Sequence, residues 1–246
     1  MLKGDEIYLG DCFDLLSQID DKSVDLILID PPYNLHNIEW DKNLPFDKLW
    51  KEYERIIKSK GNILIFASGI FAHRLALSNE KLYRYDLIWK KSKNGSPLTC
   101  KYMPAKKHEY ILVFGKSAAK YNPQMEEGEP YKRKWTPNKV NNMKYGIEGV
   151  ITDNKGTRHP STILDFPQKW SRQQQGKLHP TLKPVALCEW LIKSYSDEND
   201  IVLDNFMGSG TTCLAAKLTN RKYIGIEKEE KYFEIAKKRI EENIVL

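Results

Sequence analysis

Seven stretches of the chain show the apolar or alternating pattern of β-strands, and most of them are followed by a stretch with helical periodicity. Residues 24–29 and 201–204 are β-branched and aliphatic almost without interruption, as strands are when both of their faces are buried. The predicted strands are residues 7–9, 24–29, 62–66, 85–90, 109–114, 201–204 and 222–226. The predicted helices lie at residues 14–16, 47–57, 71–77, 185–195 and 214–216, with a last one that runs to residue 240. This alternation predicts an α/β fold with a doubly wound, mostly parallel sheet.

Two of the predicted strands, residues 85–90 and 109–114, have no helical period between them. Adjacent strands joined without a helix pair antiparallel, so the sheet should carry an antiparallel edge. The connection at residues 91–107 is basic, and its length is more typical of a functional loop than of a packing element.

Between residues 116 and 177 neither a strand nor a helix pattern persists. Aromatic side chains are scattered there among Pro, Asn, Gly and Lys, at Tyr121, Tyr131, Trp135, Tyr145 and Trp170. This aromatic content argues against a disordered segment and favours a surface that faces a ligand. We therefore expect an insert at residues 116–177, flanked by residues 1–115 and 178–246, which together form one α/β domain.

Length and composition limit the class of protein. The 246 residues suffice for one α/β core with a modest insert. No apolar run approaches the roughly 20 residues of a membrane-spanning helix, and the first residues do not resemble a signal peptide, so we expect a cytoplasmic protein with no membrane partner. The four cysteines form no Cys-x-x-Cys pair, which indicates neither a disulfide framework nor a metal site.

The positive charge of the chain is local. The whole chain carries +6, whereas residues 90–144 contain 13 basic and 4 acidic residues, a net charge of +9. A basic stretch with interspersed aromatics is typical of a surface that contacts nucleic-acid phosphates, the alternative being a solvated lysine-rich surface. The candidate DNA-binding residues are Lys106, Lys107, Lys134, Arg158 and Arg172, with His159 as a further candidate for reaching base edges.

The first candidate site is the tetrapeptide Asp30-Pro31-Pro32-Tyr33, directly after the buried strand at residues 24–29. The two prolines end the strand and stiffen the backbone at the edge of the sheet where ligands bind. These groups suit the activation of an exocyclic aromatic amine: Asp30 and the Pro31 carbonyl accept its two hydrogens, and Tyr33 stacks on the ring. A solvated Pro-Pro turn is the alternative.

The second candidate site is the turn at residues 205–212, after the buried strand at residues 201–204. Gly208 and Gly210 let backbone N–H groups approach a ligand, and the helix that follows attracts an anionic group. Glu227 stands 19 residues after Gly208, where an acidic residue grips ribose hydroxyls. The turn lacks the Lys of a phosphate-binding P-loop, and Cys213 replaces the third glycine of the dinucleotide fingerprint.

In combination, these motifs resemble those of the β-class amino DNA methyltransferases. Asp-Pro-Pro-Tyr comes first, an irregular basic region follows, and Asp-x-Phe-x-Gly-x-Gly-Thr-Thr comes near the end, with Asn205 where the family often has Pro. The resemblance covers nearly the whole chain. It implies a Rossmann-like methyltransferase fold with a target-recognition insert, and transfer of the methyl group of S-adenosylmethionine to N6 of a flipped adenine in double-stranded DNA.

The resemblance also implies roles for individual residues. The residues expected to bind and activate the target base are Asp30, Pro31, Pro32 and Tyr33. In the family, a Gly-Asp turn contacts the adenine of the cofactor, a Lys pairs with the cofactor carboxylate, and the glycine turn with the acidic residue after it completes the cofactor site. The cofactor-binding residues that the resemblance implies are Asp11, Cys12, Asp30, Lys183, Asp204, Phe206, Gly208, Ser209, Gly210, Thr211, Thr212 and Glu227. The resemblance also suggests two further partners, a second copy of the chain in a homodimer and a cognate restriction endonuclease that acts on the same site.

Four other functions share part of the pattern. Family members that methylate N4 of cytosine mostly have Ser in place of Asp30, which favours adenine. Methylation of cytosine at carbon 5 needs a Cys nucleophile in a Pro-Cys dipeptide, which this chain lacks. An NAD-dependent oxidoreductase would explain the glycine turn and Glu227, but neither the Pro-Pro-Tyr motif nor the basic insert. A non-catalytic DNA-binding protein would explain the charge but not two strands that end in ligand-type turns.

Overall fold

The computed structural model describes residues 2–33, 44–92, 100–116, 118–134, 138–140, 143–145, 151–168 and 182–245. The chain forms two compact units. The larger comprises Met1–Asn122 and Thr162–Leu246, and the smaller comprises Pro123–Ser161. Within the described part of the chain, no helix combines the length and the apolar character needed to cross a membrane.

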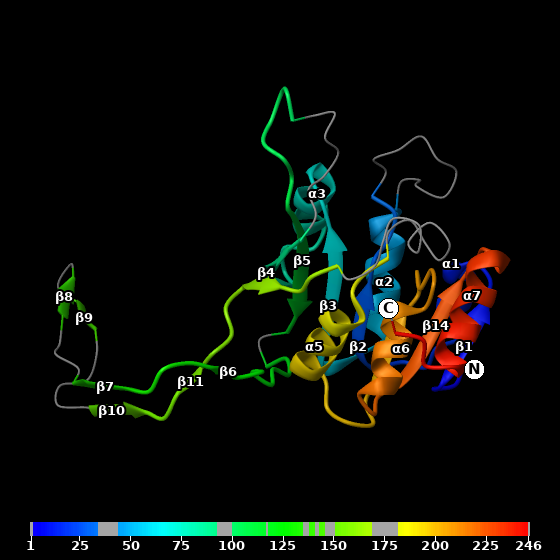
Figure 1. The fold of residues 1–246 in the computed structure, drawn as a ribbon. Helices are drawn as coiled ribbons and strands as arrows, with labels where there is room; N and C mark the ends of the chain where they lie inside the picture. Colours follow the sequence, from blue (N-terminus) through cyan, green and yellow to red (C-terminus); the bar gives the residue numbers. More distant parts are fainter. Residues whose placement is uncertain are drawn as a thin grey trace. The chain divides into compact units, whose positions relative to one another are not determined.

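The larger unit is built on one eight-stranded sheet (Figure 1). In spatial order its strands are β1 (Glu6–Leu9), β14 (Lys222–Glu227), β13 (Ile201–Asp204), β2 (Val24–Ile29), β3 (Ile57–Ala67), β5 (His108–Gly115), β4 (Tyr83–Lys90) and β12 (Ile163–Asp165). Neighbouring strands pair parallel except at β5, which is antiparallel to both β3 and β4. The predicted mostly parallel sheet with an antiparallel pair is therefore confirmed.

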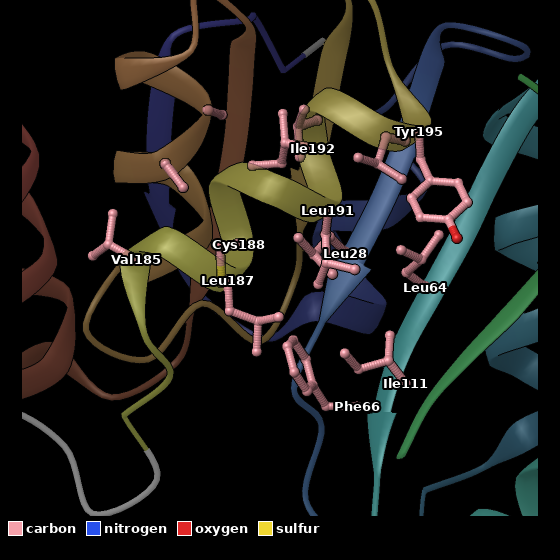
Figure 2. Close-up of a cluster of buried hydrophobic side chains, with 14 of the residues drawn as sticks. Leu28, Leu64, Phe66, Ile111, Val185, Leu187, Cys188, Leu191, Ile192 and Tyr195 are labelled. Atoms are coloured by element: carbon pink, nitrogen blue, oxygen red, sulfur yellow. The ribbon is translucent and has the colours of Figure 1, made fainter. Parts of the chain in front are cut away.

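Helices cover both faces of this sheet because alternate residues of its central strands point in opposite directions. Leu26 and Leu28 of β2 pack with residues of α5 (Val185–Tyr195), α6 (Thr211–Leu218) and α7 (Glu230–Glu241). Ile27 and Ile29 pack on the other face, where the helices are α1 (Cys12–Leu16), α2 (Phe46–Ile56) and α3 (Ile70–Ser78). Figure 2 shows the first cluster, in which side chains of α5 face the sheet.

Two features of the sheet differ from the sequence expectation. Strand β3 begins at Ile57, directly after α2, and not at residue 62. Strand β12 pairs parallel with β4 and adds an eighth strand, formed by residues that the sequence places in the irregular insert. Its three residues are too few to establish an alternating pattern, and of these only Leu164 is buried.

In the smaller unit, Pro123–Ser161, the described residues form three short antiparallel pairs. They are β7 (Tyr131–Lys134) with β10 (Ile151–Asn154), β6 (Glu126–Glu127) with β11 (Thr157–Arg158), and β8 (Asn138–Val140) with β9 (Met143–Tyr145). The expectation that no strand pattern persists there was wrong for these stretches. None of its described residues belongs to either hydrophobic cluster, so main-chain pairing rather than a buried core shapes this unit.

Candidate active site

Strand β2 ends at Ile29 and delivers Asp30 and Tyr33 to the carboxyl edge of the sheet. The Tyr33 hydroxyl donates a hydrogen bond of 2.6 Å to Oδ1 of Asp30. One face of the Tyr33 ring stacks on Phe71 of α3, with centroids 5.1 Å apart and planes 26° apart. Burial and the negative charge of Asp30 raise the pKa of Tyr33 well above its usual range, so the phenol is neutral. This arrangement fixes one oxygen of the Asp30 carboxylate.

The second oxygen of Asp30 is held by Lys183, which immediately precedes the N-cap of α5. Lys183 Nζ forms an ion pair with Asp30 Oδ2 and lies 3.4 Å from Oε2 of Glu109 on β5. The Lys183 side chain is only 7% exposed. Burial by itself lowers the pKa of Lys183, but Asp30 and Glu109 outweigh it and raise that pKa above the ordinary value. An ammonium ion is thus held in the interior beside the carboxylate.

A pocket opens next to this ion pair, with an empty volume of about 380 Å³. Its walls come from the ends of β2, β3 and β13, from the segment before α5, and from the first turn of α6: Asp30, Phe66, Leu182, Lys183, Asp204, Phe206, Met207, Gly208, Ser209, Thr211 and Thr212. Eight of these eleven residues are among the predicted cofactor-binding residues, and they come from three separate parts of the sequence.

The glycine turn between β13 and α6 needs glycine at two positions. Gly208 and Gly210 have φ angles of +51° and +75°, in the left-handed region that favours glycine. At Gly210 a Cβ atom would also lie 2.9 Å from the Cβ of Ala236 on α7, so close packing forbids a larger residue. Gly210 itself is not part of the pocket wall. Its role in the structure is to let the turn pack under α7.

Glu227, the last residue of β14, is tied to this turn by both of its carboxylate oxygens. Oε2 accepts a hydrogen bond of 2.9 Å from the backbone N–H of Gly208, and Oε1 accepts one of 2.9 Å from that of Glu229. Burial raises the pKa of Glu227 above its ordinary value, although these bonds oppose the shift. Glu227 therefore lies directly behind Gly208, which lines the pocket, and is not itself one of the lining residues.

Asp204, the last residue of β13, is a buried carboxyl in the pocket wall. Its Oδ1 accepts a hydrogen bond of 3.1 Å from the backbone N–H of Phe206. Burial raises the pKa of Asp204 to about 7, against the effect of the hydrogen bonds from Thr212 and Phe206. The turn that follows β13 is thus anchored at its start by Asp204 and at its middle by Glu227.

Comparison with known proteins agrees with this geometry. The sequence profile of a family described as DNA methylase matches residues 24–238. The type II methyltransferase M.HpaI of Haemophilus parainfluenzae is 32% identical over 92% of this chain and 71% of its own length. This chain belongs to the N6/N4 DNA methylase family.

Other relatives align over nearly the whole methylase chain. The DNA adenine methyltransferase YhdJ of Escherichia coli strain K12 is 30% identical over 94% of this chain and 81% of its own length. The crystal structure of the M1.HpyAVI–SAM complex is 29% identical and superposes with a TM-score of 0.64, covering 96% of this chain and 98% of that one. The mixed sheet with its antiparallel pair is therefore the sheet of a known methyltransferase fold.

The predicted Gly-Asp turn lies beside the site without lining the pocket. Asp11 caps α1 by accepting a hydrogen bond of 2.8 Å from the backbone N–H of Phe13. The N–H of Gly10 donates to the Glu227 carbonyl at 2.9 Å, which places this turn next to the end of β14. Cys12 is buried, and burial raises the pKa of its thiol to about 12. The structure thus places both residues near Glu227 but shows a capping role for Asp11.

The predicted DNA-binding residues of the methylase fall into three places. Lys106 and Lys107 precede β5 at the same edge of the sheet as Asp30, and Lys106 donates a 2.6 Å hydrogen bond to Ser68 Oγ while Lys107 is exposed. Lys134 and Arg158 belong to the smaller unit, where Arg158 lies over the Tyr131 ring at 4.7 Å. Other predicted residues lie outside the described part of the chain: Trp135, Trp170, Arg172 and residues 179–181.

Two charged residues of the methylase site were missed by the sequence reasoning. Glu109 is the first residue of the strand predicted at residues 109–114, a position that usually suggests exposure, yet its side chain is only 14% exposed. Arg239 of α7 is 2% exposed, and its Nη1 donates to the Ser209 carbonyl at 2.6 Å and to Thr211 Oγ1 at 3.2 Å. The one sequence signal for the burial of Arg239 was its position, as a basic residue, on the apolar stripe of α7. No sequence signal indicated the burial of Glu109, because its ion-pair partners Lys91 and Lys183 come from other parts of the sequence.

Proposed function

We propose that this methylase transfers the methyl group of S-adenosylmethionine to N6 of an adenine flipped out of double-stranded DNA. The observation that carries the proposal is the meeting of Asp30 and Tyr33 with the pocket behind the glycine turn, at one edge of the sheet. A pocket for a small cofactor and an acceptor for an amine are the two parts that such a transfer needs.

The residues around the pocket fit the cofactor. Lys183 supplies a buried cation for its carboxylate. Glu227 keeps an acceptor position for a ribose hydroxyl, because a carboxylate has about four lone-pair sites and three are used by the backbone N–H groups of Gly208, Lys228 and Glu229. Phe66, Leu182 and Met207 supply apolar walls. When bound, S-adenosylmethionine supplies an electrophilic methyl group on a sulfonium centre.

The residues after β2 act on the base. In the transfer the amino nitrogen bonds to the methyl carbon, the carbon–sulfur bond breaks, and one proton leaves the nitrogen. Asp30 accepts a hydrogen from the amine and the Pro31 carbonyl accepts the other, which directs the nitrogen lone pair toward the methyl group. Tyr33 holds Asp30 through its hydroxyl and, in this proposal, stacks on the base.

Asp30 also supports adenine as the target base. The family includes enzymes that methylate N6 of adenine and enzymes that methylate N4 of cytosine. With Asp at position 30, this chain resembles the members that act on adenine. One full-length relative at 30% identity is named a DNA adenine methyltransferase. N4 of cytosine is the second candidate, and it would use the same acceptors.

In this proposal the basic segments recognise the DNA. Lys106 and Lys107 supply phosphate contacts beside the site, and the residues of the predicted insert, with Lys134, Arg158 and Arg172, read the target sequence. Relatives named type II methyltransferases support a place in restriction–modification. An endonuclease of the same specificity as a functional partner, and a homodimer as the acting form, stay predictions from the sequence.

The test is sequencing of genomic DNA, with detection of N6-methyladenine and N4-methylcytosine, from a methylation-deficient bacterial host that expresses the protein. The expected result is N6-methyladenine at one short sequence, absent when the host expresses Asp30→Ala. N4-methylcytosine at a single sequence would refute the choice of base. Unmodified DNA, with soluble and folded protein in the host, would refute the proposed function.

A further inference from the structure

One face of the strand pair β7–β10 in the smaller unit is held by Arg158. Tyr131 and Asn154 lie opposite each other in this pair, and residues directly opposite in an antiparallel pair point to the same face. The Arg158 guanidinium lies over the Tyr131 ring, 4.7 Å from its centroid, and its Nη1 donates a hydrogen bond of 2.6 Å to Asn154 Oδ1. Arg158 therefore holds one residue of each strand.

The same guanidinium ties this pair to the neighbouring pair β6–β11, to which Arg158 itself belongs. Nη1 also donates to the Thr157 carbonyl at 2.9 Å, and Nη2 donates to the Glu129 carbonyl in the linker between β6 and β7. In the linker between β10 and β11, Gly156 has a φ angle of +102°, and a Cβ atom there would lie 2.8 Å from the Gly128 carbonyl oxygen. The two linkers therefore pass in close contact, and Arg158 holds the strand pairs on both sides of them.

Because so much of its guanidinium is in use, Arg158 is poorly placed to contact a base. Arginine recognises guanine through two parallel N–H donors. In this structure Nη1 of Arg158 has two acceptors and Nη2 has one, all within the smaller unit, and the Tyr131 ring lies against the guanidinium. A contact with a base would compete with the bonds that hold the β7–β10 pair.

The opposite face of the β7–β10 pair carries two cations and an apolar side chain. Successive residues of a strand alternate between faces, so Lys132 and Lys134 of β7 share this face with the residues opposite them, Asp153 and Ile151. All four residues are exposed. The Lys132 side chain is 75% exposed, and Ile151 is 64% exposed. Neither hydrophobic cluster includes any of the four, so the described part of the chain leaves this face open.

The chemistry of this face matches the major groove of a DNA duplex. That groove is about 12 Å wide and admits a two-stranded β-ribbon. In it a lysine meets the N7 and O6 acceptors of guanine, and an apolar side chain such as Ile151 meets the methyl group of thymine. A two-stranded pair by itself is only marginally stable in water, so a pair without a hydrophobic core gains from a partner that covers it. Lys132 and Lys134 make an anionic partner the complementary one.

We propose that the β7–β10 pair enters the major groove of the target DNA with the face that carries Lys132, Lys134 and Ile151, and that Arg158 is the positioning residue that holds this pair in place. The inference rests on the proposed function and deepens it, since it names the element of the insert that meets the base edges. Arg158 takes part in reading the target sequence through the strands that it holds, without touching a base.

The experiment measures kcat/KM for methyl transfer to a duplex that carries the target sequence found by genomic sequencing, and to duplexes with one base pair of that sequence changed. The ratio of the two values is the specificity at that base pair. Lys132→Ala is compared with Lys155→Ala as its matched control. Both lysines pair with Asp153, at 3.5 and 2.9 Å, and their side chains are 75% and 80% exposed, but Lys155 lies in the linker after β10.

Two further comparisons test the groove and the role of Arg158. The parent is assayed on target duplexes whose non-target purines are 7-deazapurines, which lack the N7 acceptor of the major groove, or 3-deazapurines, which lack the N3 acceptor of the minor groove. Arg158→Lys keeps the positive charge but not the planar fork that bridges the strand pairs. The melting temperature and the affinity for S-adenosylmethionine are measured for every variant.

Lys132→Ala should lose about tenfold to a hundredfold of specificity at one or two base pairs, and Lys155→Ala should keep the parental specificity at all of them. Arg158→Lys should lose specificity at several base pairs, including those affected by Lys132→Ala, because the whole strand pair is displaced. Its affinity for S-adenosylmethionine should not change, since the cofactor pocket belongs to the larger unit. The 7-deazapurines should lower the kcat/KM of the parent by about tenfold or more, and the 3-deazapurines should not.

Parental specificity in Lys132→Ala would remove this face from the reading of DNA, and that variant decides the matter even if Arg158→Lys fails to fold. Sensitivity to 3-deazapurines alone would move the contact to the minor groove. Loss of specificity in Arg158→Lys at a single base pair that Lys132→Ala leaves unchanged would make Arg158 a base-reading residue. A parent that methylates no DNA would refute the proposed function, whereas an active and specific parent matched by both variants would refute this inference alone.

Discussion

Glu227→Ala is the most informative change outside the base-binding residues, because the carboxylate has two separable tasks. It accepts the backbone N–H groups of Gly208 and Glu229, each at 2.9 Å, and we propose that its remaining acceptor position holds the ribose of S-adenosylmethionine. The alanine variant removes both. It frees the turn at Gly208, where φ is +51°, and leaves the ribose hydroxyls unpaired in a largely buried site.

The magnitude follows from the charge of the acceptor. A hydrogen bond to a charged group contributes roughly 1.5–3 kcal/mol. Loss of the ribose contact should therefore weaken cofactor binding by about tenfold to a hundredfold. Loss of the tether to Gly208 weakens the binding of every ligand that uses the turn, including one without ribose hydroxyls. Only the ribose contact discriminates between the two kinds of ligand.

Calorimetric titration with S-adenosylmethionine, and with an analogue that lacks both ribose hydroxyls, separates the two tasks. The parent should bind the natural cofactor about tenfold to a hundredfold better than the analogue, and Glu227→Ala should bind both almost equally. Glu227→Gln is the size-matched comparison. Its amide keeps one acceptor, so intermediate discrimination is expected. If the parent and Glu227→Ala discriminate equally, Glu227 does not touch the ribose and serves the turn alone.

The remaining predictions concern the base, the DNA and the stability of the site. Asp30→Ala should abolish methyl transfer while DNA binding in a gel-shift assay largely survives, because backbone contacts dominate affinity; transfer within tenfold of the parent would contradict its role. Lys106→Ala with Lys107→Ala should weaken binding to all DNA sequences alike and lower the slope of log affinity against log salt by about 0.9 per lost phosphate contact, and an unchanged slope would place the DNA track elsewhere. The Asp204 pKa of about 7 lies above its unfolded value, so the folded state binds the extra proton and stability is lost as the pH rises toward 7. Asp204→Asn should therefore melt above the parent by a margin that grows from pH 5 to pH 8, and a constant margin would contradict the raised pKa.

The sequence was sufficient for the features that depend on local pattern. The continuous apolar runs of β2 and β13 predicted buried parallel strands, and the prolines and glycines after them marked where each strand ends. Carboxyl ends of parallel strands share an edge of the sheet, and the pocket contains residues from both candidate sites.

The features that sequence reasoning missed depend on contacts between distant residues. Strand β12 forms by pairing with β4, and a pattern of only three residues could not predict that pairing. The burial of Glu109 depends on Lys91 and Lys183, which reach it from different segments of the chain. Lys183 itself was expected to pair with the cofactor carboxylate, and its resting partners, Asp30 and Glu109, became visible only in three dimensions. That expectation stays a prediction for the cofactor-bound state.

The topology explains why the two halves of the site meet so closely. Strands β2 and β13 are parallel neighbours, with Leu203 opposite Ile27, yet the chain leaves them in opposite directions. After β2 it passes through α2 on one face to β3, and after β13 through α6 on the other face to β14. Such a switch point opens a crevice between the departing segments. Asp30 and the glycine turn are therefore held at this crevice by two buried, neighbouring strands.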